Sequence, residues 1–355
     1  MDRDIFQKSH KRFNPLTEEW ILCSPHRLKR PWQGKLEEIP PEERPRYDPD
    51  CYLCPGNERA GGNRNPDYQG TFVFDNDFSA LVPDETAILS QKEGLLRFQM
   101  EQGICRVVCY SPRHDLTMAE MEESEIRRVI DVWIRQYLEI GSLDYIGHVQ
   151  IFENKGAVMG CSNHHPHGQI WATRSLPMEP EKENKTQHRY GKLTMGRCLL
   201  CDYMDLEDEE QERIVCRNNH WVALVPFWAK WPFETMILPF RHVGSLGELD
   251  REEKADLAEI LRRLTTRFDN LFHTSFPYTM GIHQKPTLEG DFSHWHLHFH
   301  FYPPLLRSAT VQKFMVGFEM LGTPQRDFTA EDAAQRLRSL SEIHFRKENQ
   351  KGENS

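Results

Sequence analysis

The chain of 355 residues has no long hydrophobic run and no extended block of basic residues. No apolar stretch approaches the roughly 20 residues of a membrane-spanning helix, and residues 1–14 are too polar for a secretory signal. The formal net charge is −10, which argues against nucleic acid or an anionic membrane as the main partner. A few local Arg and Lys side chains suffice to bind phosphate, so an anionic small substrate stays compatible with this composition.

The sequence also lacks an even set of cysteines, because it contains nine. An odd count without an export signal predicts no disulfide framework and favours a reducing, cytoplasmic environment. In that environment a Cys-x-x-Cys pair more often binds a metal ion or carries out redox chemistry. The chain has two such pairs, Cys51 with Cys54 and Cys198 with Cys201.

The two halves of the chain repeat the same motifs in the same order. Each half has a Cys-x-x-Cys pair, an Arg-His pair ending at His114 or His242, an amphipathic helix and a strand with a His-x-His run. The Arg-His pair precedes that run by 51 residues in the first half and 54 in the second. Strand–helix–strand units are common, so chance alignment is the alternative, but three motifs in one order favour a repeat. Strands are predicted at 72–82, 105–110, 145–152, 165–173, 220–225, 235–238, 278–283 and 296–302, and helices at 120–140 and 251–271.

The polar segments of the sequence predict where the two repeats begin and end. Residues 176–197 are rich in Glu and Lys, which predicts a linker or long loop. A helix is expected at 329–344 with Thr329 as its N-cap, and residues 347–355 are expected to form a disordered tail. The predicted units are therefore a first repeat at 1–175, a linker at 176–197, a second repeat at 198–346 and the tail.

The residues most typical of chemistry lie between 154 and 171. A loop with Gly160 and Ser162 precedes a predicted strand, and small residues let backbone N–H groups approach a phosphate. Residues two apart in a strand face the same side, so His165, His167 and Gln169 are expected on one face. A lone histidine is more often a core or surface residue, but several imidazoles and an amide in this register indicate a site.

The run His165-Pro166-His167-Gly168-Gln169 resembles the histidine-triad pattern of the hexose-1-phosphate uridylyltransferase family. The resemblance extends to segments at 13–17, 24–33, 65–68, 152–156, 227–235 and 301–311, and covers about residues 10–345. It implies an α+β fold of two tandem histidine-triad-like repeats, each a mostly antiparallel sheet with helices, fused into one larger sheet.

The resemblance also implies an activity. UMP would pass from UDP-glucose to galactose 1-phosphate by a ping-pong mechanism, giving glucose 1-phosphate and UDP-galactose, with a covalent uridylyl group on His167. Imidazole suits this role as a nucleophile at neutral pH, and a backbone carbonyl would orient it. Gln169 stands where hydrolase relatives have a third His, and cannot act as a general acid. Gly160, Cys161 and Ser162 would stabilise charge on the transferred phosphoryl group.

Further residues match the family's substrate-binding positions. Those matching phosphate-binding arginines are Arg27 and Arg30, and those near the nucleoside or phosphates are Asn76, Asp77 and Asn154. A third set matches a segment that holds the sugar from the partner subunit and so implies a homodimer: Lys313, Val316, Phe318, Glu319 and Gln325. Phe318 departs from the Tyr of some relatives, which puts one hydrogen bond to the hexose in doubt.

Three metal sites are expected. Cys51, Cys54, His114 and His165 match the family's zinc site, whose two thiolates and two imidazoles form a closed, structural shell; reduced core cysteines are the alternative. Glu183, His283, His298 and His300 match a second site, for iron or zinc. The repeat adds a hypothesis, an extra zinc site at Cys198, Cys201, His242 and His296, although two buried thiols beside an incidental His would give the same pattern. His164 offers a competing imidazole, but only His165 and His167 share the alternating register.

Two other functions remain open at this point. A related nucleotidyltransferase or phosphorylase would act on another sugar phosphate or nucleotide, and a zinc-organised regulatory protein would have lost catalysis. Gln169 and the segment 313–325 favour the transferase for galactose 1-phosphate. The intact His167 argues against the regulatory protein.

Overall fold

The computed structural model describes residues 8–29, 44–83, 90–91 and 93–348. Arg30, part of the expected substrate site, and residues 349–355 of the expected tail lie outside the described residues. None of the helices in the described ranges combines the length and apolar character needed to cross a bilayer.

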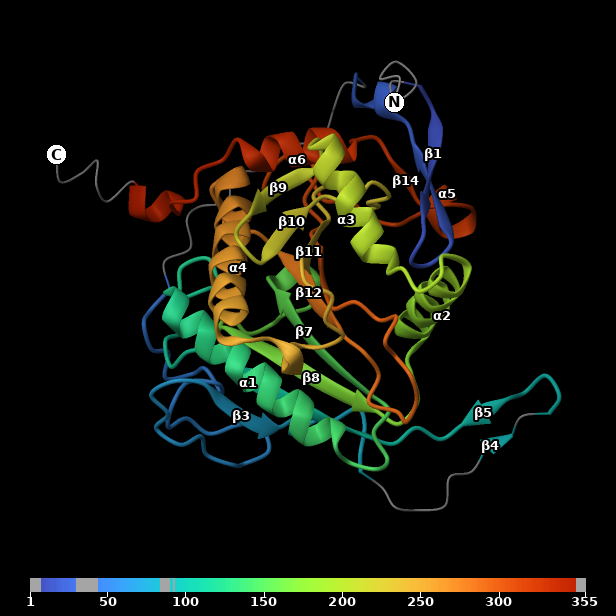
Figure 1. Ribbon diagram of the computed structural model, residues 1–355. Coiled ribbons are helices and arrows are strands. Elements are labelled where there is room, and N and C mark those ends of the chain that lie inside the picture. Colours follow the sequence, from blue (N-terminus) through green and yellow to red (C-terminus); the bar gives the residue numbers. More distant parts are fainter. Residues whose placement is uncertain (1–7, 30–43, 84–89, 92, 349–355) are drawn as a thin grey trace.

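A nine-stranded sheet forms the centre of the protein (Figure 1). Its order is β3-β6-β8-β7-β12-β13-β11-β10-β9, and every neighbouring pair is antiparallel. The strands of the first half are β3 (Phe72–Asp75), β6 (Gly103–Cys109), β7 (His148–Lys155) and β8 (His167–Thr173). Those of the second half are β9 (Ile214–Arg217), β10 (Trp221–Leu224), β11 (Thr235–Pro239), β12 (Tyr278–His283) and β13 (His298–Tyr302).

The strand order confirms the predicted fold of two fused repeats. Strands β7 and β12 pair at the centre, with Ile151 opposite Ile282. Moving outward, β8 and β13, then β6 and β11, then β3 and β10 occupy matching places in the two halves. Each half also has one long helix before its central strand: α1 (Glu123–Gly141) and α4 (Arg251–Phe272). Both begin with a capping box, at Glu122–Glu125 and at Asp250–Glu253.

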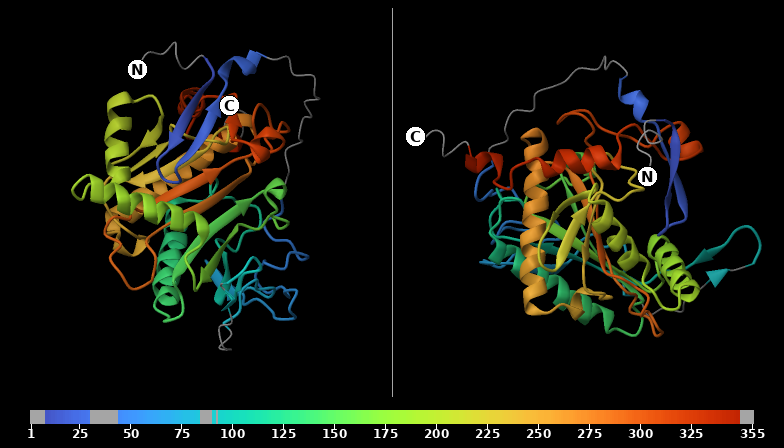
Figure 2. Two further views of the ribbon diagram at one scale, coloured as in Figure 1. Left: turned by 90° about the vertical axis from the view of Figure 1, so that its right-hand side faces the viewer. Right: turned by 45° about the horizontal axis from the view of Figure 1, so that its top comes forward.

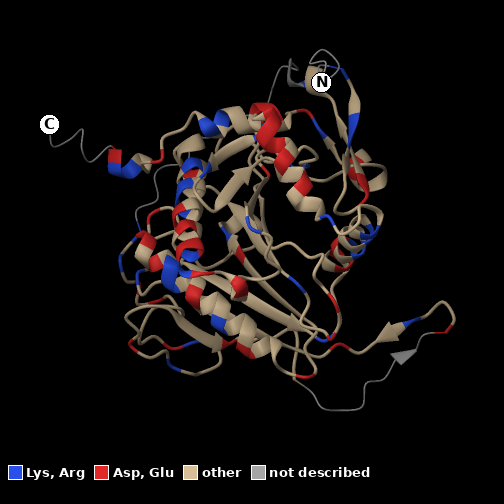
Figure 3. Cartoon of the chain, in the orientation of Figure 1, with Lys and Arg blue, Asp and Glu red and all other residues tan. Residues whose placement is uncertain are grey.

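The main core lies between one face of the sheet and helices α1 and α4, which pack on each other (Figures 1 and 2). Every second strand residue contributes to it, as Ile151, Ile170, Ile282 and Phe299 do. The alternate residues of the central strands face the other side, and these include His167, Gln169 and His300. Charged side chains line the outer helices, while the central strands are mostly uncharged (Figure 3). The period of two therefore places the polar site opposite the main core.

The segment 176–197, predicted as a linker or loop, is mostly helix α2 (Met178–Leu193), followed by α3 (Leu199–Glu210). The prediction of a loop was wrong because α2 buries mainly polar side chains, among them Glu183, Thr186 and Gln187, and so has no apolar stripe. Its contacts are instead hydrogen bonds, such as that from the Thr186 hydroxyl to the carbonyl of Leu16 at 2.8 Å.

The C-terminal helix α6 spans Ala330–Arg338 and is shorter than predicted, although Thr329 is its N-cap, as expected. It ends early because α4 binds the chain that follows. The Arg267 guanidinium donates to the carbonyls of Leu337, Arg338 and Leu340, each at 2.8 Å. These bonds replace the intrahelical partners that a longer helix would supply.

An outlying layer packs beside the second half. It comprises β1 (His10–Asn14), β2 (Glu19–Cys23), 3₁₀ helix η2 (Pro25–Lys29), α5 (Phe318–Leu321) and β14 (Gln325–Arg326). Strand β14 pairs parallel with β2. A second ribbon, β4 (Ser90–Gln91) with β5 (Phe98–Gln99), extends from the first half.

Glu331, in α6, joins this layer to the second half. Its carboxylate accepts two hydrogen bonds from the buried Arg12, each at 2.9 Å, and one from Arg213 at 2.9 Å. Burial alone would raise the pKa of Glu331, but Arg12 and then Arg213 lower it to about 2. The ionised carboxylate therefore links β1, α6 and the α3–β9 turn.

We expect Glu331→Gln to lower the free energy of unfolding by about 3 kcal/mol at pH 7. An unfolded Glu titrates near 4.5 and the folded one near 2. The contribution is thus complete above pH 4.5 and disappears as the pH falls through 2. Urea unfolding at pH 7 and pH 3 measures this difference. Glu181→Gln, at an exposed pair with Lys185, is the control and should cost less than about 0.5 kcal/mol. Equal effects of the two substitutions would contradict the assignment.

Candidate active site and metal centres

The loop between β7 and β8 places the predicted catalytic residues together. It contains 3₁₀ helix η3 (Ala157–Met159), flanked by Gly156 and Gly160 with φ of 90° and 79°. Glycine adopts such backbone angles without strain. After η3, Cys161 lines a narrow hollow of ≈ 30 Å³, which Asn154 and His167 also line. Of the three residues predicted on one strand face, His167 and Gln169 lie on β8, whereas His165 precedes the strand, which begins at His167.

His167 is held in one tautomer. Its Nδ1 lies 2.7 Å from the carbonyl oxygen of His165, the backbone bond that was expected. A carbonyl only accepts, so Nδ1 carries the proton and Nε2 keeps its lone pair. Burial lowers the pKa of His167 more than this hydrogen bond raises it. The imidazole is therefore neutral near neutral pH and available as a nucleophile.

The other predicted catalytic residues are close to His167 in the sequence. The Gln169 side-chain oxygen accepts from the Trp171 indole at 3.1 Å, which directs its NH₂ group as the remaining donor. The Cys161 thiol donates to the carbonyl of Asn163 at 3.0 Å. Ser162 is exposed, and Gly160 ends η3 in the left-handed conformation. Of these loop residues, Cys161 lines the hollow of His167, and the N–H groups of Gly160 and Cys161 donate to the carbonyls of Ala157 and Gly156, at 3.0 and 3.4 Å.

The first metal cluster lies beside the same strand. The ligand atoms of Cys51, Cys54, His114 and His165 all lie within 4.8 Å of one another, and all four residues are buried. The Cys54 sulfur is 3.7 Å from Nδ1 of His114 and 3.5 Å from Nδ1 of His165. Nε2 of His165 meets the carbonyl of Ser111 at 2.8 Å and the Tyr68 hydroxyl at 3.0 Å. Two thiols and two Nδ1 atoms in this arrangement fit a tetrahedral zinc ion.

The second cluster lies where α2 covers β12 and β13. Glu183 oxygens lie 2.7 Å from His283 Nδ1, 3.3 Å from His298 Nε2 and 3.4 Å from His300 Nε2. Within the described residues, the latter two nitrogens are buried without a hydrogen-bond partner. Burial would raise the pKa of Glu183, but His283 and His298 lower it well below its usual value. An ionised carboxylate with three imidazoles fits a divalent metal ion.

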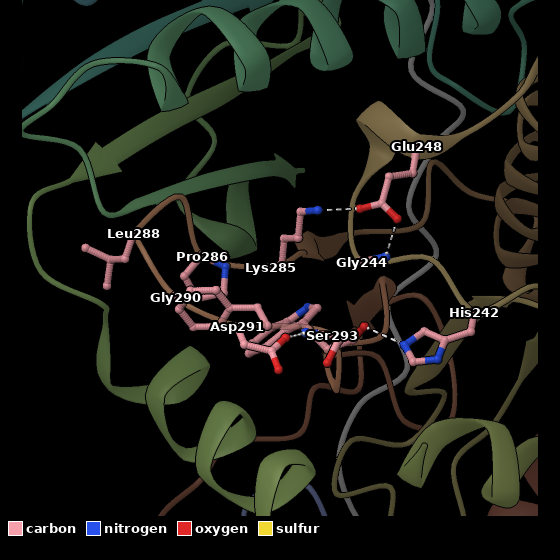
Figure 4. Close-up of a pocket in the computed structure, with 11 residues that line it drawn as sticks. His242, Gly244, Glu248, Lys285, Pro286, Leu288, Gly290, Asp291 and Ser293 are labelled. Carbon is pink, nitrogen blue, oxygen red and sulfur yellow. Dashed lines mark hydrogen bonds and ion pairs between the residues drawn. The ribbon is translucent and has the colours of Figure 1, made fainter. Parts of the chain in front are cut away.

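The second half brings its own cysteines and histidines together. The ligand atoms of Cys198, Cys201 and His242 lie within 4.8 Å of one another, and His296 Nδ1 lies 3.3 Å from the Cys198 sulfur. A hollow of ≈ 440 Å³ opens beside this group, with His242 at one end and the Lys285–Glu248 ion pair (2.7 Å) in its wall (Figure 4). Of the three clusters, this one is nearest to solvent, because His242 is exposed.

The predicted substrate residues fall into two groups. Asn154 lines the hollow of His167, whereas Asn76 and Asp77 follow the end of β3 that is level with Cys105 and Trp171, not with His167. The other group lies in the outlying layer, at the opposite end of the protein (Figures 1 and 2).

Contacts hold the second group together. The Lys313 ammonium binds Glu319 and the carbonyl of Gln325, the latter at 2.7 Å. The Gln325 amide donates to Asp327 at 2.5 Å, and Asp327 pairs with Arg27 at 3.4 Å. Val316 and Phe318 are exposed beside them. One chain therefore does not bring this group to its own His167.

Several residues near His167 were missed by the sequence analysis. Arg44 and Ser275 line both the narrow hollow and an adjoining one of ≈ 200 Å³, which Arg346 also lines, and His164, expected only as a competing imidazole, lines both hollows too. Buried Glu153 lines the narrow hollow, and burial raises its pKa to about 7. Arg44 and Arg346 come from opposite ends of the chain and have no motif spacing to His167, so only the fold reveals them.

Comparison with known proteins shows the family of the chain. The galactose-1-phosphate uridyl transferase N-terminal domain family matches residues 1–177, and its C-terminal domain family matches residues 181–349. The chain is 55% identical over 337 residues to galactose-1-phosphate uridylyltransferase of Haemophilus influenzae, covering 95% of this chain and 96% of that protein. It is 50% identical to that of Rattus norvegicus, with 96% and 89% covered. A solved uridylyltransferase structure matches with a TM-score of 0.73 and 26% identity, covering 93% of this chain and 97% of that one. The chain therefore belongs to the galactose-1-phosphate uridyl transferase family of enzymes.

Proposed function

We propose that the protein transfers UMP from UDP-glucose to galactose 1-phosphate by a ping-pong mechanism through a uridylyl-His167 intermediate, in galactose metabolism. The observation that carries this proposal is the tautomer of His167. Its protonated Nδ1 is 2.7 Å from the His165 carbonyl, which leaves the Nε2 lone pair as a nucleophile beside a hollow with Arg44 in its wall.

In the first half-reaction, His167 Nε2 attacks the α-phosphorus of UDP-glucose. The N–P bond forms, the bond from that phosphorus to the bridging oxygen breaks, and the electron pair leaves with glucose 1-phosphate. In the second, a phosphate oxygen of galactose 1-phosphate attacks the same phosphorus and His167 departs. Because each sugar phosphate is a good leaving group, no general acid is needed. This agrees with an amide at Gln169, whose NH₂ would donate to the phosphoryl oxygen together with backbone or side-chain donors of Gly160–Ser162.

Two metal ions would stabilise the structure around the site without taking part in the reaction. Zinc held by Cys51, Cys54, His114 and His165 would fix the carbonyl that orients His167, two residues away. Iron or zinc at Glu183, His283, His298 and His300 would bind α2 to the sheet. Both assignments rest on the donor sets, and the second rests also on the buried His298 and His300 nitrogens, which have no hydrogen-bond partner among the described residues.

The site would be completed by a second copy of the chain. Lys313, Glu319 and Gln325 lie far from His167, next to exposed apolar side chains at Phe314, Val316, Phe318, Met320 and Leu321. Such a patch is typical of an interface, so we infer a homodimer in which this segment holds the hexose. Sedimentation of the purified protein tests the inference, and a monomer at micromolar concentration would contradict it. Nine free cysteines support a reducing, cytoplasmic location.

The ping-pong mechanism is tested by isotope exchange. With UDP-glucose and labelled glucose 1-phosphate but no galactose 1-phosphate, we expect label to enter UDP-glucose, because the first half-reaction reverses on its own. ADP-glucose as donor is the matched control for the base. Exchange only when galactose 1-phosphate is present would contradict the covalent route, and equal exchange with ADP-glucose would assign the protein to another nucleotide.

A further inference from the structure

The second half has a group of two cysteines and two histidines like the first, in which Cys198, Cys201 and His242 lie within 4.8 Å of one another and His296 contacts both sulfurs. The distances from His296 Nδ1 to the sulfurs of Cys198 and Cys201 are 3.3 and 3.4 Å. A tetrahedral zinc ion with bonds of 2.0–2.3 Å places neighbouring ligand atoms about 3.5 Å apart. The corresponding distance in the first cluster, from His165 Nδ1 to the Cys54 sulfur, is 3.5 Å. The spacing of the second-half ligands therefore suits a metal ion between them.

The two thiols are arranged by the start of a helix. Cys198 is the N-cap of α3 and Cys201 lies in its first turn. The Cys201 backbone N–H donates to the Cys198 sulfur at 3.4 Å, as the Leu53 N–H donates to Cys51 at 3.4 Å in the first cluster. A helix N-terminus favours negative charge, so it stabilises the thiolate form that binds metal.

The two imidazoles are each held by a backbone carbonyl. His296 Nε2 lies 3.1 Å from the carbonyl of Pro239, and His242 Nε2 lies 2.9 Å from that of Trp295. Figure 4 shows this bond at the His242 ring. In both rings Nε2 is the protonated donor, which leaves Nδ1 as the ligand atom. Such outer bonds orient metal-binding histidines, and in His296 the bond leaves Nδ1 facing both sulfurs.

The same segment determines the orientation of a residue in the second metal centre. His298 Nδ1 lies 2.7 Å from the carbonyl of His296, the same distance as from His167 Nδ1 to the His165 carbonyl. His298 thus directs Nε2 toward Glu183, at 3.3 Å. In each half, one histidine of the Cys₂His₂ cluster lies two residues before another histidine, and its backbone carbonyl fixes the tautomer of that histidine.

We propose that Cys198, Cys201, His242 and His296 bind a structural zinc ion, and that this ion holds His298 in the orientation that the Glu183 centre requires. Neither statement depends on the proposed uridylyl transfer. The ion is more accessible than the one in the first cluster, because His242 is exposed and lines the ≈ 440 Å³ hollow.

Metal counting on the full chain tests the site. The protein is purified under reducing conditions, reconstituted with zinc and analysed by mass spectrometry of its metals. Cys198→Ser with Cys201→Ser should bind one zinc fewer than wild type. The matched control is Cys105→Ser with Cys216→Ser, at two buried cysteines outside the clusters, and should lose none. An unchanged zinc count in the first variant would overturn the site.

A milder variant covers the case in which the double substitution does not fold. His242→Ala changes an exposed side chain, so we expect a folded protein by circular dichroism. During timed exposure to a chelator it should release one zinc at least about tenfold faster than wild type. An unchanged release rate would overturn the assignment of His242.

The link to the second centre has its own readout. In the Cys198→Ser/Cys201→Ser protein, the metal at Glu183 should be held about 10- to 100-fold more weakly against a chelator. The converse variant, Glu183→Gln, should lose that metal and keep the thiolate-to-cobalt absorption of the cobalt-loaded protein. Loss of one zinc from the cysteine variant with unchanged affinity at the Glu183 centre would overturn the positioning role.

Discussion

Replacing His167 with alanine is expected to lower kcat/KM for UDP-galactose formation by at least about 10,000-fold. The substitution removes the only described imidazole of the hollow whose Nδ1 is fixed by a neighbouring carbonyl. Without Nε2, no N–P bond forms, and both half-reactions are lost together. The assay follows UDP-galactose from UDP-glucose and galactose 1-phosphate under saturating metal.

His164→Ala is the matched control for this prediction. His164 lines the same hollow but is exposed and precedes the triad. We expect it to lower the rate by less than about tenfold, as for a group that contacts substrate without bonding to it. A His167→Ala protein with more than about 1% of wild-type activity, far above the level that loss of a nucleophile leaves, would contradict the assignment.

Gly168→Ala should damage both stability and activity, although it adds one methyl group. A Cβ at Gly168 would overlap the Tyr110 hydroxyl and would lie 2.9 Å from the carbonyl oxygen of Phe152 on β7. The carbonyl belongs to the sheet and does not move easily. We expect about 3 kcal/mol of lost unfolding free energy, measured by urea titration, and a loss of activity of more than about 100-fold because His167 shifts with its neighbour.

Two further variants make this prediction specific. Gly191→Ala, in α2, places its Cβ 3.6 Å from the Arg197 carbonyl oxygen, an ordinary contact, and should be neutral or stabilising by up to about 1 kcal/mol. Tyr110→Phe removes one of the two clashing atoms, so in a double-mutant cycle it should restore part of the stability of Gly168→Ala. No coupling between the two positions would show that the clash with Tyr110 is not the cause.

The strand pattern explains why much of the fold was predictable. Alternation with a period of two places Ile151 and Ile170 in the core and His167 and Gln169 on the opposite face, and this pattern is local. The repeat then predicts which strands correspond, and the order about the β7–β12 pair confirms it. Helix α2 was not predicted because its buried positions are polar. The partners of these side chains, such as the His residues near Glu183, come from strands that are distant in the sequence.

The candidate site also has a part that could be predicted from the sequence and a part that could not. The first two metal clusters were expected from the resemblance and the third from the repeat, and the ligand atoms of each do lie close together. Arg44 and Arg346 could not be predicted as site residues from the sequence, because only the packing of the chain's two ends brings them to one hollow. The segment 313–325 was assigned by resemblance alone, and its distance from His167 agrees with a role in a second copy.

Covalent labelling tests the central claim most directly. The protein is incubated with UDP-glucose labelled in the uridylyl group, without galactose 1-phosphate, and the digested chain is mapped by mass spectrometry. The account predicts an acid-labile uridylyl group on His167, which disappears when galactose 1-phosphate is added and never forms in His167→Ala. Turnover to UDP-galactose without such a label, or a label on another residue, would contradict it.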